Sequence, residues 1–129
     1  MKLNFCSKVG VIAISLSLVL GCSSSSEQVM TIASQYGMIC NGHGIIERHF
    51  ICKRANSGIW QYAQLFGFDY VPGYEYVVMV CDIDGMGNAF RVETVLSKVE
   101  KTSTGIPEYM AQYDDQMVGL PCDSVFGKE

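Results

Sequence analysis

The clearest hydrophobic pattern lies in the middle of the chain. The segment Tyr74–Asp82 is rich in aromatic and β-branched residues and predicts a strand. Asp84–Asn88 supplies the glycine and asparagine residues of a tight turn. From Ala89 to Val99 the chain alternates, with Phe90, Val92, Thr94 and Leu96 on one face and Arg91, Glu93 and Ser97 on the other. Because a period of two is typical of a half-buried strand, a β-hairpin is predicted here.

Weaker patterns flank this hairpin. Val29–Ser34 and His49–Lys53 are short and β-prone, while Ile59–Phe68 has mixed spacing that favours a helical turn over a strand. Pro107, followed by Tyr109, Tyr113 and Met117 at four-residue spacing, indicates a short helix. The predicted fold is a small, single, mainly β domain, with α+β as the alternative: an antiparallel sheet able to close into a barrel, plus one or two short helical turns.

The amino terminus has the pattern of an export signal. Lys2 and Lys8 precede the apolar run Val9–Leu20, which is shorter than the roughly 20 residues that cross a bilayer. Residues 1–21 are therefore interpreted as a signal peptide. Val19-Leu20-Gly21-Cys22 resembles the lipobox of bacterial lipoproteins. The resemblance implies a diacylglyceryl thioether on Cys22, cleavage before it, and a fatty chain such as palmitate on the new amino terminus. The alternative is an ordinary signal peptide with a chance cysteine.

Residues 22–28 are interpreted as a lipidated tether, since Ser23–Ser26 cannot bury apolar surface. In Gram-negative lipoproteins, an aspartate after the lipidated cysteine favours retention at the inner membrane. Ser23 stands there in this chain, so the resemblance implies the outer membrane. The expected location is the bacterial cell envelope, lipid-anchored at Cys22, at the outer membrane facing the periplasm.

Charge narrows the range of partners. The precursor carries a net charge of −4, and removing residues 1–21 leaves seven basic and thirteen acidic residues, a net charge of −6. An acidic chain without a basic stripe repels phosphates, which argues against nucleic acid as a partner. No cofactor motif is present, so no cofactor is expected. The expected partners are the membrane, through the lipid on Cys22, and an envelope protein.

The cysteines predict a disulfide framework. Cys6 leaves with the signal peptide and Cys22 carries the lipid, so four cysteines remain for pairing, and these allow three connectivities: Cys40, Cys52, Cys81 and Cys122. We favour Cys40–Cys52, whose 13-residue loop is worth about 3 kcal/mol, and by elimination Cys81–Cys122, whose 42-residue loop is worth about 4 kcal/mol.

A metal site is the alternative use of the same residues. Cys40, His43, His49 and Cys52 form the pattern C-x2-H-x5-H-x2-C, and thiolate and imidazole are the usual zinc ligands. An oxidising compartment favours pairing of the thiols, so the disulfide is preferred.

Two further groups have a structural and a functional interpretation. Asp82–Asn88 contains part of a calcium loop but lacks its closing glutamate, so a hairpin turn is preferred. Seven aromatic residues are assigned to the core rather than to a ligand groove: Trp60, Tyr62, Phe66, Phe68, Tyr70, Tyr74 and Tyr76. No catalytic motif is recognisable, so no enzyme is expected; a carboxylate such as Asp69 or Asp82 beside either histidine would reopen that possibility.

The stretch Leu65–Tyr76, together with Val95–Lys98, resembles the bacterial family called domain of unknown function 4377. Thr31–Ser34, Cys40–Gly42 and the later Cys52 fit the same pattern, so the resemblance covers about residues 29–99. It implies a small exported domain, often a lipoprotein, with no established activity. Residues 29–101 are thus expected to form the β domain and 102–129 a C-terminal extension. The expected function is that of a non-catalytic lipoprotein that binds or supports another envelope component.

Overall fold

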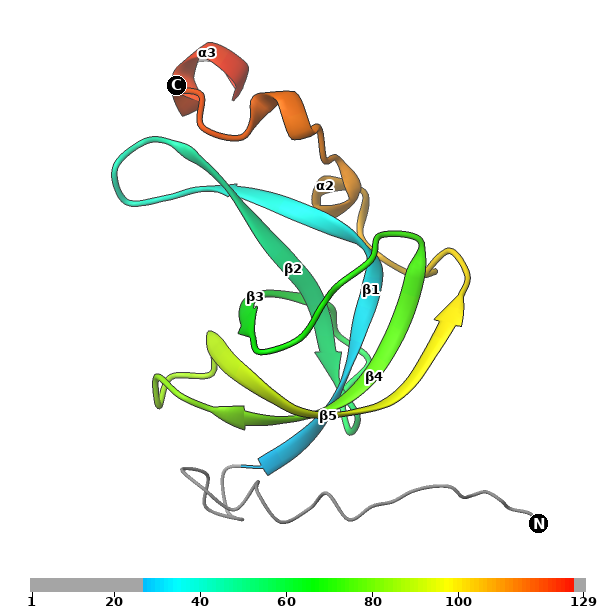
Figure 1. Cartoon of the computed structure of the whole chain (residues 1–129). Coiled ribbons are helices and arrows are strands. Elements are labelled where there is room, and N and C mark those ends of the chain that lie inside the picture. The colour runs from blue at the N-terminus through cyan, green and yellow to red at the C-terminus, as the bar shows by residue number, and fades with distance from the viewer. Residues whose placement is uncertain (1–26, 127–129) are drawn as a thin grey trace, which may run out of the picture.

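In the described part of the chain, five strands are followed by a short C-terminal extension (Figure 1). The computed structural model describes residues 27–126. The predicted signal peptide, Cys22 and the serine run lie outside this part of the chain. The strands run in chain order as β1 Glu27–Cys40, β2 Ile46–Arg54, β3 Gln61–Phe66, β4 Tyr74–Asp82 and β5 Ala89–Glu100.

The strands close into a barrel in the order β1-β2-β3-β5-β4. β1 pairs antiparallel with β2 between residues 30 and 40 and with β4 over residues 27–32, and β3 pairs parallel with β5. This is the strand order of the OB-fold, a five-stranded Greek-key barrel. The prediction of a small, mainly β, barrel-like domain is confirmed. One departure is the parallel β3–β5 pair, since the sheet was expected to be antiparallel throughout.

Most predicted strands are present. Val29–Ser34 lies within β1, His49–Lys53 lies within β2, and the predicted hairpin corresponds to β4 and β5. The helical turn expected over Ile59–Phe68 is wrong, because this segment contains β3. Ala63 and Leu65 are both buried in the barrel core two residues apart, which is the spacing of a strand.

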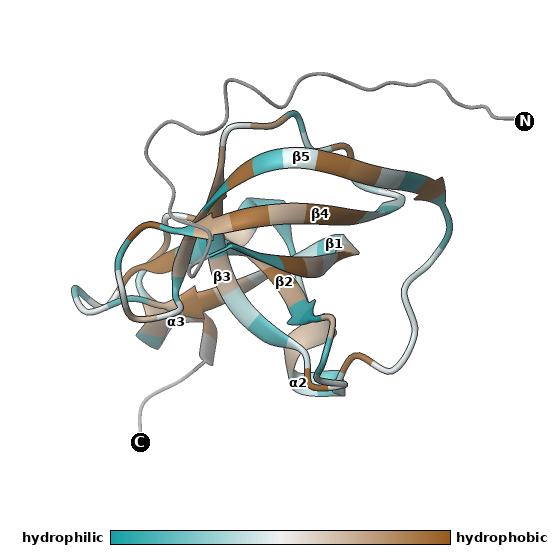
Figure 2. Cartoon of the chain, turned by 90° about the horizontal axis from the view of Figure 1, so that it is seen from below, coloured by the Kyte–Doolittle hydropathy of each residue, from teal (hydrophilic) through white to brown (hydrophobic). Residues whose placement is uncertain are grey.

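β5 departs from strict alternation. It contacts β3 only over Ala89–Arg91, and its register against β4 shifts twice, so two bulges bend it. The predicted alternation of buried and exposed residues holds as far as Val92. Beyond it, Thr94 and the rest of the strand are exposed on both faces. Figure 2 shows hydrophobic segments continuing along β5 to its end.

The loop between β3 and β4 fills one end of the barrel. The Tyr70 hydroxyl donates a hydrogen bond to the Ala33 carbonyl at 2.6 Å, and the Val71 amide donates to the Tyr76 hydroxyl at 2.9 Å. The ring of Phe68 packs edge-on against Tyr76, with centroids 5.3 Å apart. Phe68, Tyr70 and Tyr76 therefore complete the hydrophobic core at this end of the barrel.

The C-terminal extension comprises α2 Glu108–Ala111, the 3₁₀ helix η2 Asp115–Met117 and α3 Cys122–Phe126. The helix expected after Pro107 is only one turn long, so the four-residue spacing does not correspond to a continuous helix. Met110 is buried against Ala33 on the outside of the barrel, while the ring of Tyr113 contacts Tyr36. Over residues 27–126, no helix has the length and apolarity needed to cross a membrane.

Candidate functional site

The described disulfide joins Cys40 to Cys122, so both predicted pairings are wrong. In the β1–β2 hairpin, Cys40 lies opposite Ile46 near the tip, whereas Cys52 lies opposite Ile32. Eight residues of strand separate these two levels, about 25 Å at the usual rise per residue. Because a disulfide needs Cα atoms less than about 7 Å apart, Cys40 and Cys52 cannot pair. Cys122 is bonded to Cys40 and is therefore not bonded to Cys81.

Cys52 is a free thiol inside the barrel. Its side chain is fully buried in the core, and burial raises the pKa of the thiol to about 12. A thiol that stays protonated at neutral pH is a poor nucleophile and a poor metal ligand. Cys52 therefore acts as a small core residue.

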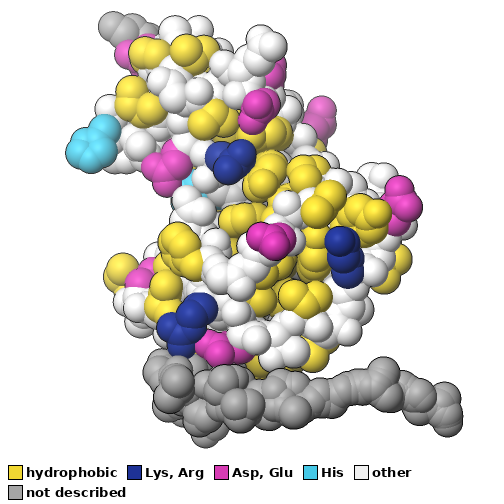
Figure 3. Space-filling view, viewed as in Figure 1, with side chains coloured by type: hydrophobic (Ala, Val, Ile, Leu, Met, Phe, Trp, Pro, Cys, Tyr) yellow, Lys and Arg dark blue, Asp and Glu magenta, His cyan; other side chains and the backbone are white. Residues whose placement is uncertain are grey.

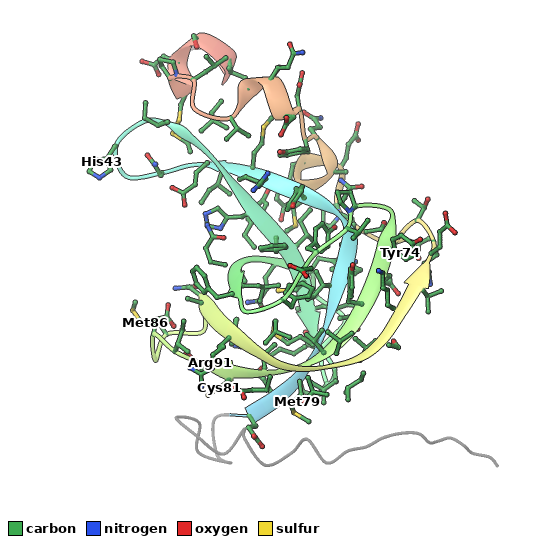
Figure 4. The ribbon with its side chains drawn as sticks, viewed as in Figure 1. His43, Tyr74, Met79, Cys81, Met86 and Arg91 are labelled. Carbon is green, nitrogen blue, oxygen red and sulfur yellow. A yellow bond between two sulfur atoms is a disulfide. The ribbon has the colours of Figure 1, made fainter. Side chains whose placement is uncertain are left out.

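The predicted metal site is not assembled. His43 lies at the exposed tip of the β1–β2 hairpin, where Figure 4 labels it, while His49 lies within β2. Cys40 is oxidised and Cys52 is in the core. No group of three or more potential ligands among His, Cys, Asp and Glu occurs in the part of the chain that the structure describes.

The carboxylates of the β4–β5 turn bind the backbone. Asp82 accepts hydrogen bonds from the amides of Asp84 and Gly85, at 3.2 and 2.8 Å. Asp84 accepts one from the Met86 amide at 2.9 Å, which lowers the pKa of Asp84. The hairpin-turn interpretation therefore explains both carboxylates.

The assignment of the seven aromatic residues to the core is correct for six of them. They are buried or packed against the two hydrophobic clusters: Trp60, Tyr62, Phe68, Tyr70, Tyr74 and Tyr76. Phe66, at the end of β3, has an exposed fraction of 53%. The alternation of β3 explains this exposure, because Leu65 occupies the inward position.

Phe66 belongs to a continuous outer face of β2, β3 and β5. Strand alternation places its members on the outside, since their chain neighbours Phe50, Leu65 and Val92 contribute to the core. The cross-strand pairs Ile51–Tyr62 and Phe66–Arg91 set these residues side by side. We use the name outer face for six residues: Glu47, His49, Gln64, Phe66, Arg91 and Glu93.

Glu47 holds one end of the outer face together. Its carboxylate accepts hydrogen bonds from Asn41 at 3.0 Å, His49 at 2.8 Å and Gln64 at 3.4 Å. The bond from Asn41, and then the bond from His49, lowers the pKa of Glu47. The side chain still has 39% of its surface exposed. Sequence patterns alone did not single out Glu47. Its only signal is the spacing Glu-x-His, which places both side chains on one face of a strand.

Two polar atoms of the outer face lack partners. Arg91 Nε donates to Glu93 Oε2 at 2.7 Å and His49 Nε2 lies 2.8 Å from Glu47 Oε2. The buried atoms Arg91 Nη2 and His49 Nδ1 have no hydrogen-bond partner, and they are the only such side-chain atoms within residues 27–126. Because buried polar atoms are nearly always paired, two unpaired ones on the same face call for an explanation.

The surface is hollowed between the hairpin tip and the barrel, as the left side of Figure 3 shows. Figure 4 places His43 above this hollow and Met86 and Arg91 below it. The hairpin loop 41–45 thus bounds one side and the β4–β5 turn bounds the other. β3 contacts that turn directly, since the backbone amide of Gln64 donates a hydrogen bond to the backbone carbonyl of Asn88 at 2.9 Å.

The outer face combines an exposed aromatic ring with polar and charged side chains. Glu47 and His49 make the carboxylate–imidazole contact that could serve general base catalysis, with Glu47 in place of the Asp69 or Asp82 considered above. In the described chain His49 has no hydrogen bond to a serine, threonine or cysteine that it could activate. The available groups are an exposed aromatic ring, an amide, a carboxylate and a guanidinium.

Comparison with known proteins adds no relative. No family model, curated protein or solved structure matches the chain, so the resemblance to the family of unknown function stays a prediction.

Proposed function

We propose that this chain is a non-catalytic lipoprotein of the bacterial envelope. Fatty chains on Cys22 hold it at the outer membrane, facing the periplasm, and its barrel binds another envelope component. Membership in the family called domain of unknown function 4377 is part of the same proposal.

The positions of the amino-terminal end and the hairpin tip at opposite poles of the barrel support this proposal. β1 begins at Glu27, at the pole opposite the β1–β2 hairpin tip (Figure 1). Cys22 lies only five positions before Glu27, a reach of at most about 17 Å. A lipid at Cys22 would therefore keep the Glu27 pole close to the membrane and point the hairpin tip and the hollow beside it away from the membrane.

The construction of the hairpin tip supports a role in binding. The Cys40–Cys122 disulfide, together with hydrogen bonds from the Ile46 amide to Leu120 and from the Gly119 amide to Ile46, ties the C-terminal extension to it. A projecting hairpin braced in this way is preorganised, which lowers the entropic cost of binding. The net acidic charge of the whole chain favours an uncharged or basic partner over a polyanion.

Anchoring and binding can be tested together. Labelling cells with a palmitate analogue should mark the wild-type protein, and mass spectrometry should find the acyl groups on Cys22. The variant Cys22→Ser should lose both the label and its place in the envelope. A bare Cys22 in the wild-type protein would refute the anchor.

Position-specific photocrosslinking tests the orientation. A photoreactive residue replacing His43 should form adducts with an envelope component in the anchored protein. Asn56, in the exposed turn after β2, is the matched control, because the Ala55 amide ties this turn to Val29 near the start of β1. Adducts from position 56 alone would contradict the proposed orientation.

A further inference from the structure

We infer that one face of the barrel, on the side where the chain enters β1, lies directly on the phospholipid surface. This inference rests on the proposed lipid anchor and names what covers the barrel beside it. We use the name anchor-side face for six uncharged residues on the outside of β1, β4 and β5: Val29, Thr31, Val77, Met79, Thr94 and Ser97.

The strand register sets these residues in two rows across three strands. The first row is Val29–Met79–Thr94, and the second is Thr31–Val77–Ser97. Directly paired residues project from the same side of a sheet. The chain neighbours of the β1 and β4 members point the other way, because they belong to the core: Met30, Ile32, Tyr76, Val78 and Val80. The six side chains therefore form one continuous surface on the outside of the barrel.

The anchor-side face carries no charged side chain, unlike the outer face of β2, β3 and β5. Glu75 lies at its rim, in the next row opposite Val99, and the Lys101 ammonium is 3.5 Å from the Glu75 carboxylate. Val99 has an exposed fraction of 51% and extends the apolar surface. A surface of valine and methionine with hydroxyl groups at one edge matches the boundary between lipid head groups and acyl chains.

The place of this face in the chain indicates what covers it. Val29 lies two positions after Glu27, the end of β1 that a lipid on Cys22 would hold within about 17 Å of the membrane. Figure 4 labels Met79 near the start of β1, and Figure 2, seen from below, shows β5, β4 and β1 side by side. A folded domain of about 100 residues is roughly 30 Å across. Neither another protein nor a second copy of this chain fits between the face and the membrane.

The charge of the protein indicates how the contact is made. The chain has a net charge of −6 after removal of residues 1–21, so anionic head groups do not attract it. The contact is therefore apolar, and a membrane of zwitterionic lipid is sufficient for it.

Quenching of tryptophan by brominated lipid tests the contact. The lipidated mature protein is placed in phosphatidylcholine vesicles, with or without bromine near the head-group end of the acyl chains. Thr94→Trp puts a ring on the exposed end of the first row, and His43→Trp puts one at the hairpin tip as the control. Trp60 contributes the same background to both variants. Bromine should remove about half or more of the added emission at position 94 and almost none at position 43, because interfacial contacts reach only about 5–10 Å into the boundary.

A charge on the anchor-side face should reduce this quenching. In the Thr94→Trp protein, Met79→Glu should lower it at least about twofold, since a carboxylate is costly at an apolar boundary. Met117→Glu is the matched control and should leave the quenching unchanged, because Met117 is also half-buried but lies in the C-terminal extension, at the opposite pole (Figure 1). Thermal unfolding checks that each variant is folded, and Ser97→Trp is the second probe if Thr94→Trp is not.

Three results would overturn the inference while leaving the anchor intact. They are the absence of quenching at position 94 in protein that floats with the vesicles, equal quenching at positions 94 and 43, and quenching that Met79→Glu does not change. A wild-type protein that fails to float with the vesicles would instead refute the lipid anchor, and this inference with it.

Discussion

Replacing Cys40 and Cys122 together by serine should remove a large share of the stability of the domain. The disulfide joins residues 82 positions apart, and on the loop-entropy model such a cross-link is worth about 4.5 kcal/mol at 25 °C. A domain of this size has a free energy of unfolding of about 5–15 kcal/mol. The double variant avoids leaving an unpaired thiol that could exchange with Cys52.

Urea unfolding measures the loss. Trp60 is nearly buried and is the only tryptophan, so its fluorescence reports on the packing of β3 and the extension, and far-ultraviolet circular dichroism reports on the barrel. With an m-value of about 1.5 kcal/mol per molar urea, the midpoint should fall by roughly 3 M. Coincident transitions by the two probes would show that the extension and the barrel unfold together.

Cys52→Ala separates this connectivity from the one expected from the sequence. Cys52 is a free core thiol, so the substitution should cost about 1 kcal/mol through lost packing. If Cys40 were bonded to Cys52, Cys52→Ala would cost as much as the double variant. A double variant within about 1 kcal/mol of the wild type would refute the reasoning.

Three further outcomes are expected. In the folded protein Cys52 should resist iodoacetamide at pH 8 and react only after unfolding, because burial raises its pKa to about 12; fast labelling would contradict its burial. Gly37→Ala should destabilise the protein by about 1–3 kcal/mol, because its Cβ would lie 2.6 Å from the Tyr62 ring, whereas Gly42→Ala, with open space around it, should cost under 1 kcal/mol in the same urea assay. Folding lowers the pKa of Glu47, so its contribution to stability is present above the ordinary value of 4.5 and is lost as the pH falls through the lowered pKa. In the wild type, amide exchange in residues 41–45 should accelerate as the pH falls through this lowered pKa. Glu47→Gln should show no such step.

The sequence predicts the elements of this fold better than their arrangement. The strand Tyr74–Asp82 follows from its β-branched and aromatic residues, and its observed bounds are the same. The parallel contact of β3 with β5 has no local signal, because it depends on how the whole sheet closes. The pattern around β3 misleads because its large apolar residues face different surroundings. Trp60, just before the strand, and Tyr62 pack in the second cluster, whereas Phe66 lies on the outer face.

The candidate site was still less predictable. Cysteine spacing favoured the short Cys40–Cys52 loop, but the long β1–β2 hairpin places the two residues at different levels, eight strand positions apart. The close spacing of the two histidines and two cysteines in the sequence also favoured a metal site. The same hairpin keeps these residues apart in the structure. Glu47 and Arg91 look like ordinary surface residues in the sequence, and only the register between three strands brings them onto one face.

β1 pairs with partners on both of its edges, and this has a consequence for how the protein is made. Residues 27–32 of β1 pair with residues 76–81 of β4, and residues 30–40 pair with β2, so the earliest of the described strands to leave the ribosome is fully bonded only after β4 has been made. Pairings this distant in sequence slow folding. The amino-terminal half of β1 therefore stays without its β4 partner until residue 81 of the 129 has been synthesised.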